Sequence, residues 1–292
     1  MDVSPSPGVD KPAAVLVQLG PDGPELCPPG AAFLRADDTG VLRGDGIFER
    51  FVVLSGQPRH LEDHLARMAR SAQSVQLKAP GPEAWRTAVD AAIEAWTGGE
   101  EWSMRLVCTR GPEDDGGPPC AYVLGQELSA SVARQRQAGI AVVTLARGMP
   151  SGLADEAPWL LLGAKTLSYA LNMAAKRWAE SKGADDAIFV GTDGLVWEGA
   201  NSGVVVSYGG RLVSPPASVG ILDSISVARL FSAAESAGWD VAREELKVDE
   251  LFEADGVWLS SSLRFARVHT LDGKTLPPAP AHEELVALSA AS

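Results

Sequence analysis

Helical and strand-like hydrophobic patterns alternate along almost the whole chain, and this alternation limits the folds that it can adopt. Apolar residues at every second position predict strands, and apolar residues at i, i+3 and i+4 predict helices. We expect strands at 13–18, 47–57 (with a turn at 55–56), 104–111, 121–125, 139–147, 186–207, 256–262 and 268–276. We expect helices at 60–77, 82–97, 167–183 and 224–237. Because the two kinds of element interleave, the fold class is α/β or α+β.

The predicted helices each carry one apolar stripe, which we expect to face a core. The stripes are Leu65, Met68, Ala72 and Val75; Trp85, Ala88, Val89, Ala92 and Trp96; Leu167, Ala170, Leu171, Ala174 and Trp178; and Val227, Leu230, Phe231 and Ala234. Ser224 is the expected N-cap of the last of these helices. The alternating pattern stops between about 126 and 137. We therefore predict an N-terminal lobe (1–127), an inter-domain connection (128–137) and a C-terminal lobe (138–292).

Charge and composition exclude several classes of partner. The chain has 25 Lys and Arg against 38 Asp and Glu, and its net charge of −13 argues against nucleic acid or an anionic membrane as the main partner. No apolar run approaches the ~20 residues that span a bilayer. The first residues do not match a secretory signal, so we expect a cytoplasmic protein. Three irregularly spaced cysteines predict neither a disulfide framework nor a zinc half-site.

Two weak motifs do not support a metal or nucleotide site. Gly273-Lys274-Thr275 resembles the end of a phosphate loop, but Val268 stands where that loop needs its first glycine. His60 and His64 are four residues apart on a predicted helix, where exposed histidines are a simpler interpretation than a zinc half-site. We therefore predict no metal site.

A lysine, a carboxylate and two anion-binding positions remain as candidate functional groups. Lys165 follows the apolar run LLLGA, where burial would favour the neutral amine that imine chemistry needs. Glu198 lies in an apolar strand and needs a cationic partner there. The helix start at Ser224 and the turn 260–262 could each bind a phosphate, or could be an ordinary cap and an ordinary turn. Together these groups are what a pyridoxal phosphate (PLP) pocket requires.

Four motifs in order extend this hypothesis: RGDGIFE (43–49), GAKTLSYA (163–170), IFVGTDGLVWEG (188–199) and ARVHTLDG (266–273). With them the chain resembles the fold-type IV PLP enzymes, or class IV aminotransferases, from about residue 36 to residue 273. Within that family it is most similar to the aminodeoxychorismate lyase-like members of actinobacteria. The resemblance implies a two-domain fold with the cofactor between the lobes, and a homodimer.

The same resemblance implies roles for individual residues. Lys165 matches the lysine that bonds to the cofactor, and Glu198 matches the acid that pairs with its pyridine nitrogen. The positions that match the family's phosphate ligands are Arg67, Ile225, Ser226 and Ser261. Tyr169 lies one position away from a tyrosine that contacts the cofactor phenolate in some members.

The implied reaction is the cleavage of 4-amino-4-deoxychorismate to 4-aminobenzoate and pyruvate, for folate synthesis. The alternatives are transamination of D-amino or branched-chain amino acids, and a non-catalytic protein that keeps the pocket as a scaffold. The segments that resemble the family's substrate side contain Arg43, Arg50, Arg105, Arg110 and Ser262, which suit a substrate with carboxylates. Arg50 replaces a threonine of the family pattern. Asp223-Ser224 replaces proline-glycine, and an aspartate beside a phosphate is unfavourable unless its side chain points away.

Overall fold

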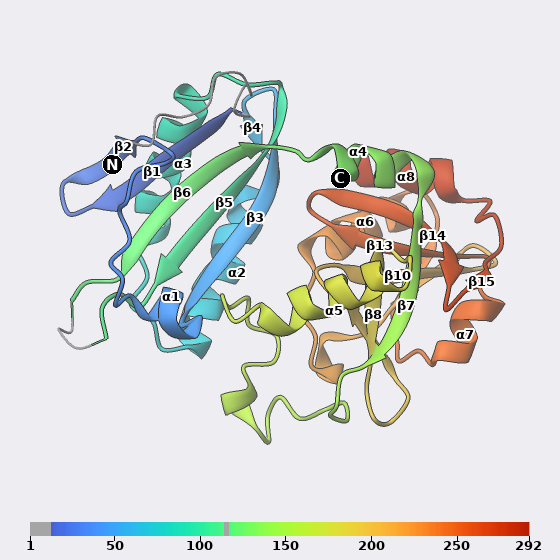
Figure 1. Cartoon of the computed structure of the whole chain (residues 1–292). Helices are drawn as coiled ribbons and strands as arrows, with labels where there is room; N and C mark the ends of the chain where they lie inside the picture. The colour runs from blue at the N-terminus through green and yellow to red at the C-terminus, as the bar shows by residue number, and fades with distance from the viewer. Residues whose placement is uncertain (1–12, 114–116, 292) are drawn as a thin grey trace.

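The computed structural model describes residues 13–113 and 117–291. The first twelve residues of the predicted N-terminal lobe and residues 114–116 of the loop after 111 lie outside the described residues. Two β-sheets with helices against them lie side by side, and one segment joins them at one end (Figure 1). The expected mixed α and β fold is confirmed.

The first sheet is antiparallel, in the order β2-β1-β6-β5-β3-β4. Its strands are β1 (Ala14–Gly20), β2 (Gly23–Cys27), β3 (Gly46–Leu54), β4 (Gln57–Pro58), β5 (Glu101–Thr109) and β6 (Cys120–Glu127). The short helix α1 (Thr39–Arg43) precedes β3, and helices α2 (Leu61–Ser74) and α3 (Pro82–Glu94) pack against one face. The stripes predicted for these two longer helices enter the core, although Trp96 is only partly buried.

The second sheet is mixed, in the order β12-β11-β10-β13-β14-β7-β8-β9, with β15 beside β14. Its strands are β7 (Ile140–Ala146), β8 (Asp186–Val190), β9 (Val196–Gly199), β10 (Gly203–Tyr208), β11 (Arg211–Ser214), β12 (Asp240–Arg243), β13 (Gly256–Ser261), β14 (Arg264–Leu271) and β15 (Lys274–Thr275). The accompanying helices are α4 (Ala130–Ala138), α5 (Ala170–Ser181), α6 (Ile225–Ser236), α7 (Val248–Glu253) and α8 (His282–Ala291). Helix α6 buries its predicted stripe, and the Ser224 hydroxyl accepts a hydrogen bond from the Val227 amide as the expected N-cap.

Helix α4 occupies most of the segment predicted as the connection between lobes. None of its residues is buried. Because a helix that is polar on all sides has no apolar stripe, the hydrophobic pattern does not reveal it. Its Arg136 donates to the Leu263 carbonyl beside β14 and pairs with Glu101 at the start of β5, so the helix ties the two sheets together.

The helix predicted over 167–183 does not bury the apolar stripe expected for it. The helix begins at Ala170, and Ala175 and Ala179 are its buried residues, which pack towards β7 and β8. Leu171 and Trp178 are 45% and 54% exposed. Small residues allow close packing on the sheet, whereas the larger apolar side chains of α5 face outward in the single chain. Among the described residues no helix is long and apolar enough to cross a membrane.

Candidate active site

Lys165 belongs to an extended segment that crosses from the second sheet to the first. The Phe48 amide donates to the Lys165 carbonyl at 3.0 Å, and the Leu167 amide donates to the Gly46 carbonyl at 2.8 Å. The Lys165 amide also donates to the Ser71 hydroxyl of α2 at 3.0 Å. These bonds hold the lysine against β3, although it is 94 residues from Ser71 in sequence. Lys165 therefore lies between the two sheets.

A cavity of about 860 Å³ surrounds the Lys165 side chain. The ammonium lies 4.5 Å from the centre of the Phe48 ring and 3.4 Å from the Tyr169 hydroxyl. Burial lowers the pKa of Lys165 to about 8, against the attraction of Glu49 and Glu198. A substantial neutral fraction is therefore present near pH 8, as a lysine needs for bonding to a carbonyl carbon and for carrying a proton.

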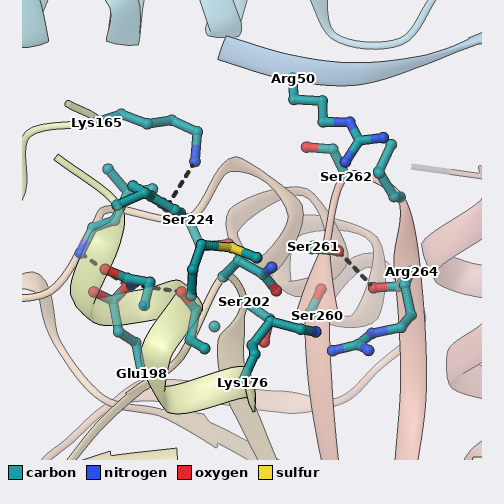
Figure 2. Close-up of a pocket in the computed structure, with 18 of the residues that line it drawn as sticks. Arg50, Lys165, Lys176, Glu198, Ser202, Ser224, Ser260, Ser261, Ser262 and Arg264 are labelled. Atoms are coloured by element: carbon teal, nitrogen blue, oxygen red, sulfur yellow. Dashed lines mark hydrogen bonds between the residues drawn. The ribbon is translucent and has the colours of Figure 1, made fainter. Parts of the chain in front are cut away.

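Glu198 on β9 lines the same cavity (Figure 2), and among the described residues no lysine or arginine lies within ion-pair distance of it. Its Oε2 accepts from the Leu222 amide at 3.3 Å. Burial raises the pKa of Glu198 to about 7. A positively charged partner would stabilise the ionised form of this buried carboxyl group, and a protonated pyridine nitrogen would be such a partner.

Arg67 lies in α2 with its side chain almost fully buried. Its Nε and Nη2 donate to the two oxygens of Glu49, both at 2.7 Å, and its Nη1 donates to the Asp223 carbonyl at 3.0 Å. The Asp223 side chain is exposed and does not line the cavity, so it points away from the position where an aspartate would repel a phosphate. Arg67 thus faces the start of α6 from the other lobe.

The expected phosphate ligands come together around that helix start. Ser226 and Ser261 line the cavity, and Ile225 is the first residue of α6, where backbone amides are free. The Ser261 hydroxyl donates to the Arg264 carbonyl at 3.3 Å. Two further cavity hydroxyls, of Ser202 and Ser260, are buried and have no partner among the described residues. These orphaned donors indicate a polar ligand.

Two of the predicted substrate arginines lie directly opposite each other in the cavity wall. Arg50 on β3 and Arg105 on β5 form a cross-strand pair, and neither makes an ion pair with a carboxylate of the described chain. Arg50 donates to the Ser103 hydroxyl at 3.1 Å. Burial, together with the charge of Arg105, lowers the pKa of Arg50 to about 10. Like charges placed opposite each other destabilise a sheet, so this pair indicates an anion between or above them.

The other two arginines lie elsewhere. Arg43 is outside the cavity lining, and its largely exposed guanidinium is ion-paired with Glu113. Arg110 binds Asp45 and the carbonyls of Val75 and Gln76, so its contacts stabilise the first lobe. Ser262 lines the cavity as predicted for a substrate-binding residue.

Sequence reasoning missed two buried residues beside the site. Glu49 and His64 are both 0% exposed, and His64 Nδ1 lies 2.7 Å from Glu49 Oε2. The prediction that His64 is exposed is wrong, because α2 turns it onto the ring of Phe51 in the core. A charged residue within the apolar strand GIFERFVV was the available signal for Glu49, the same signal that singled out Glu198.

The residues present fit pyridoxal phosphate. Lys165 would hold it covalently, Glu198 would face the pyridine nitrogen, and the phosphate would bind Arg67, Ser261 and the start of α6. The cofactor supplies an electron-withdrawing ring that stabilises negative charge on the substrate carbon next to nitrogen. Fold and site together define a PLP-dependent enzyme.

Comparison with known proteins agrees with this class. The model of the family "Amino-transferase class IV" matches residues 46–270, and the chain belongs to this family. The chain is 42% identical to the bifunctional aminodeoxychorismate lyase / D-amino acid transaminase of Mycobacterium tuberculosis over 269 residues, which are 89% of this chain and 93% of the relative.

Solved structures give the same result. A hypothetical aminotransferase from Mycobacterium tuberculosis in its PLP-bound form superimposes with a TM-score of 0.90 at 42% identity, covering 95% of this chain and 98% of that chain. A fold IV transaminase from Curtobacterium pusillum superimposes with a TM-score of 0.89 at 38% identity and the same coverage. The chain is therefore a PLP-dependent enzyme of fold type IV acting on an amino substrate, and not the non-catalytic scaffold considered above.

Proposed function

We propose that this enzyme cleaves 4-amino-4-deoxychorismate to 4-aminobenzoate and pyruvate. The observation that carries the proposal is the pair Arg50 and Arg105, placed opposite each other in the cavity that holds Lys165. The substrate has two carboxylates, and guanidinium groups without an acidic partner bind carboxylates strongly. The relative from Mycobacterium tuberculosis carries this lyase activity in its name.

In this proposal each side chain of the cavity has its own role in the reaction. Arg50 and Arg105 orient the substrate through its carboxylates. Lys165 Nζ removes a proton from the substrate carbon that bears nitrogen, because its lowered pKa leaves it able to accept one near neutral pH. Glu198 would keep a proton on the pyridine nitrogen of the cofactor, and Ser262, in the cavity wall, would contact the substrate.

Transamination of D-amino acids is the second candidate. A dicarboxylate such as 2-oxoglutarate also fits two unpaired arginines, and the same relative is named as a D-amino acid transaminase. Both reactions begin with proton removal by Lys165, so the position of the substrate decides between them.

The first experiment is the absorption spectrum of the PLP-loaded protein before and after borohydride. We expect a visible band that borohydride removes and that Lys165→Ala lacks. Product analysis then follows, with 4-aminobenzoate and pyruvate from aminodeoxychorismate, or an oxo acid from a D-amino acid and 2-oxoglutarate. The absence of the band in excess PLP would overturn the proposal.

We also infer a homodimer located in the cytoplasm. Large apolar side chains are exposed on α1, on the segment before Lys165 and on α5: Val41, Leu42, Trp159, Leu160, Leu171, Met173 and Trp178. The Ser168 hydroxyl donates to the Gly44 carbonyl at 3.2 Å, which places the end of α1 beside the start of α5. Such a patch supports burial against a second copy. All three cysteines are free thiols, in keeping with a reducing compartment.

A further inference from the structure

A chain of three polar side chains runs from the core of the first lobe to the wall of the cavity. Glu49 Oε2 lies 2.7 Å from His64 Nδ1, and His64 Nε2 lies 3.4 Å from the Ser262 hydroxyl. Glu49 and His64 are fully buried, whereas Ser262 lines the cavity. Binding of the cofactor explains why Glu49 holds Arg67, but it does not explain why His64 contacts Ser262, the cavity hydroxyl predicted to bind substrate.

The protonation state of His64 follows from its surroundings. Burial alone would raise the pKa of Glu49, yet the hydrogen bonds from Arg67 and His64 hold it at about 2, so it is a carboxylate that can only accept. Burial lowers the pKa of His64, and although Glu49 opposes this, Arg67 and Lys165 add to it. The ring is therefore neutral, with its one proton on Nδ1 and a lone pair on Nε2.

The protonation state of His64 determines whether the Ser262 hydroxyl can accept a hydrogen bond from a ligand in the cavity. An unprotonated Nε2 can only accept, so the hydroxyl of Ser262 must donate its proton to His64. The Ser262 oxygen, in the cavity wall, then keeps lone pairs that can accept a hydrogen bond from a ligand. Figure 2 shows the guanidinium group of Arg50, which can only donate, directed towards Ser262. The cavity wall thus contains both an acceptor, the Ser262 hydroxyl, and a donor, the Arg50 guanidinium group.

We propose that His64 is a positioning residue that makes Ser262 a hydrogen-bond acceptor, and that this pair selects a carboxylic acid with an N–H or O–H donor close to the carboxylate. Arg50 binds the carboxylate and Ser262 accepts from the donor. Hydroxy acids and free amino acids meet this requirement, whereas plain carboxylic acids lack the donor. The inference rests on the proposed function in one respect, that the substrate carboxylate binds in this cavity.

The binding test uses malate and succinate, which differ only in a hydroxyl next to a carboxylate. In calorimetric titrations of the PLP-loaded protein we expect malate to bind about five- to tenfold more tightly, as one additional hydrogen bond provides. Ser262→Ala should abolish the preference and Ser262→Thr should keep it. The matched control is Ser131→Ala, at the cavity rim, whose hydroxyl bonds that of Ser129. Equal binding of the two acids by the unaltered protein, or a preference that survives in Ser262→Ala, would overturn the proposal.

The role of His64 is tested separately. In His64→Asn the amide can still donate to Glu49 but does not reach Ser262, so the malate preference should fall to about that of Ser262→Ala, and the double variant should show no further loss. His60→Asn, at the N-cap position before the same helix and outside this chain of bonds, is the control. If His64→Asn does not fold, nitrogen-15 NMR of the four histidines of the unaltered protein decides the matter.

The NMR measurement should show His64 protonated on Nδ1 and unprotonated on Nε2. A proton on Nε2 at neutral pH would refute the proposal. These readouts do not depend on turnover. If His64 has the expected tautomer and malate is preferred, but the borohydride-sensitive band is absent, the proposed function is overturned and this inference stands. If the band is present but the tautomer or the malate preference is not as expected, this inference is overturned and the proposed function stands.

Discussion

Removing the charge of Glu198 should stabilise the cofactor-free protein, and the gain should depend on pH. Burial raises the pKa of this carboxyl from 4.5 to about 7 in the folded protein. The folded state therefore binds the proton more tightly than the unfolded chain, so its stability falls as the pH rises from 4.5 through about 7. The difference between the two pKa values corresponds to a loss in the free energy of unfolding on the order of 3 kcal/mol above pH 7.

Glu198→Gln keeps an acceptor for the Leu222 amide but carries no charge. We expect urea unfolding of the cofactor-free variant to show a gain of about 3 kcal/mol over the unaltered protein at pH 7.5 and less than about 1 kcal/mol at pH 5. Glu180→Gln, at the exposed rim of the cavity, is the matched control and should change little at either pH. A gain that is equal at the two pH values, or a loss at pH 7.5, would refute the argument that Glu198 lacks a cationic partner until the cofactor binds.

Three further changes test the structure. Gly46→Ala should cost about 1–3 kcal/mol in thermal or urea unfolding, because a Cβ there would lie 2.6 Å from the Cys108 carbonyl oxygen and 2.7 Å from a methyl of Leu167, whereas Gly30→Ala, with open space around it, should be nearly neutral. Arg105→Leu should raise KM for a dicarboxylate by roughly 10²-fold with intact PLP binding, and an unchanged KM would remove Arg105 from the substrate site. Trp178→Glu should shift the protein from dimer to monomer in light scattering, and a dimer that persists would place the interface elsewhere.

Most of the helices and strands near the site could be predicted because their buried residues recur at short, regular intervals along the sequence. Strand β6 alternates buried and half-buried residues over most of its length, and α2 and α6 bury their apolar stripes. Lys165 and Glu198 stood out for a similar reason, since charge inside an apolar stretch is visible in the sequence itself. Helix α4 gave no such signal because it is polar on all sides, and α5 gave a misleading one because its large apolar residues face outward from the single chain.

The sequence by itself determined the alternation of helices and strands, the lysine and acid of the proposed site, and the helix start that we propose as a phosphate site. The tertiary structure decided which groups meet. Arg67 reaches the Asp223 carbonyl across 156 residues, and Arg50 faces Arg105 only because β3 and β5 pair in one register. Periodicity records which side of an element is buried, but it contains no information on which distant element covers that side. Contacts between lobes and the chain of bonds from Glu49 through His64 to Ser262 therefore become visible only when the two sheets are placed side by side.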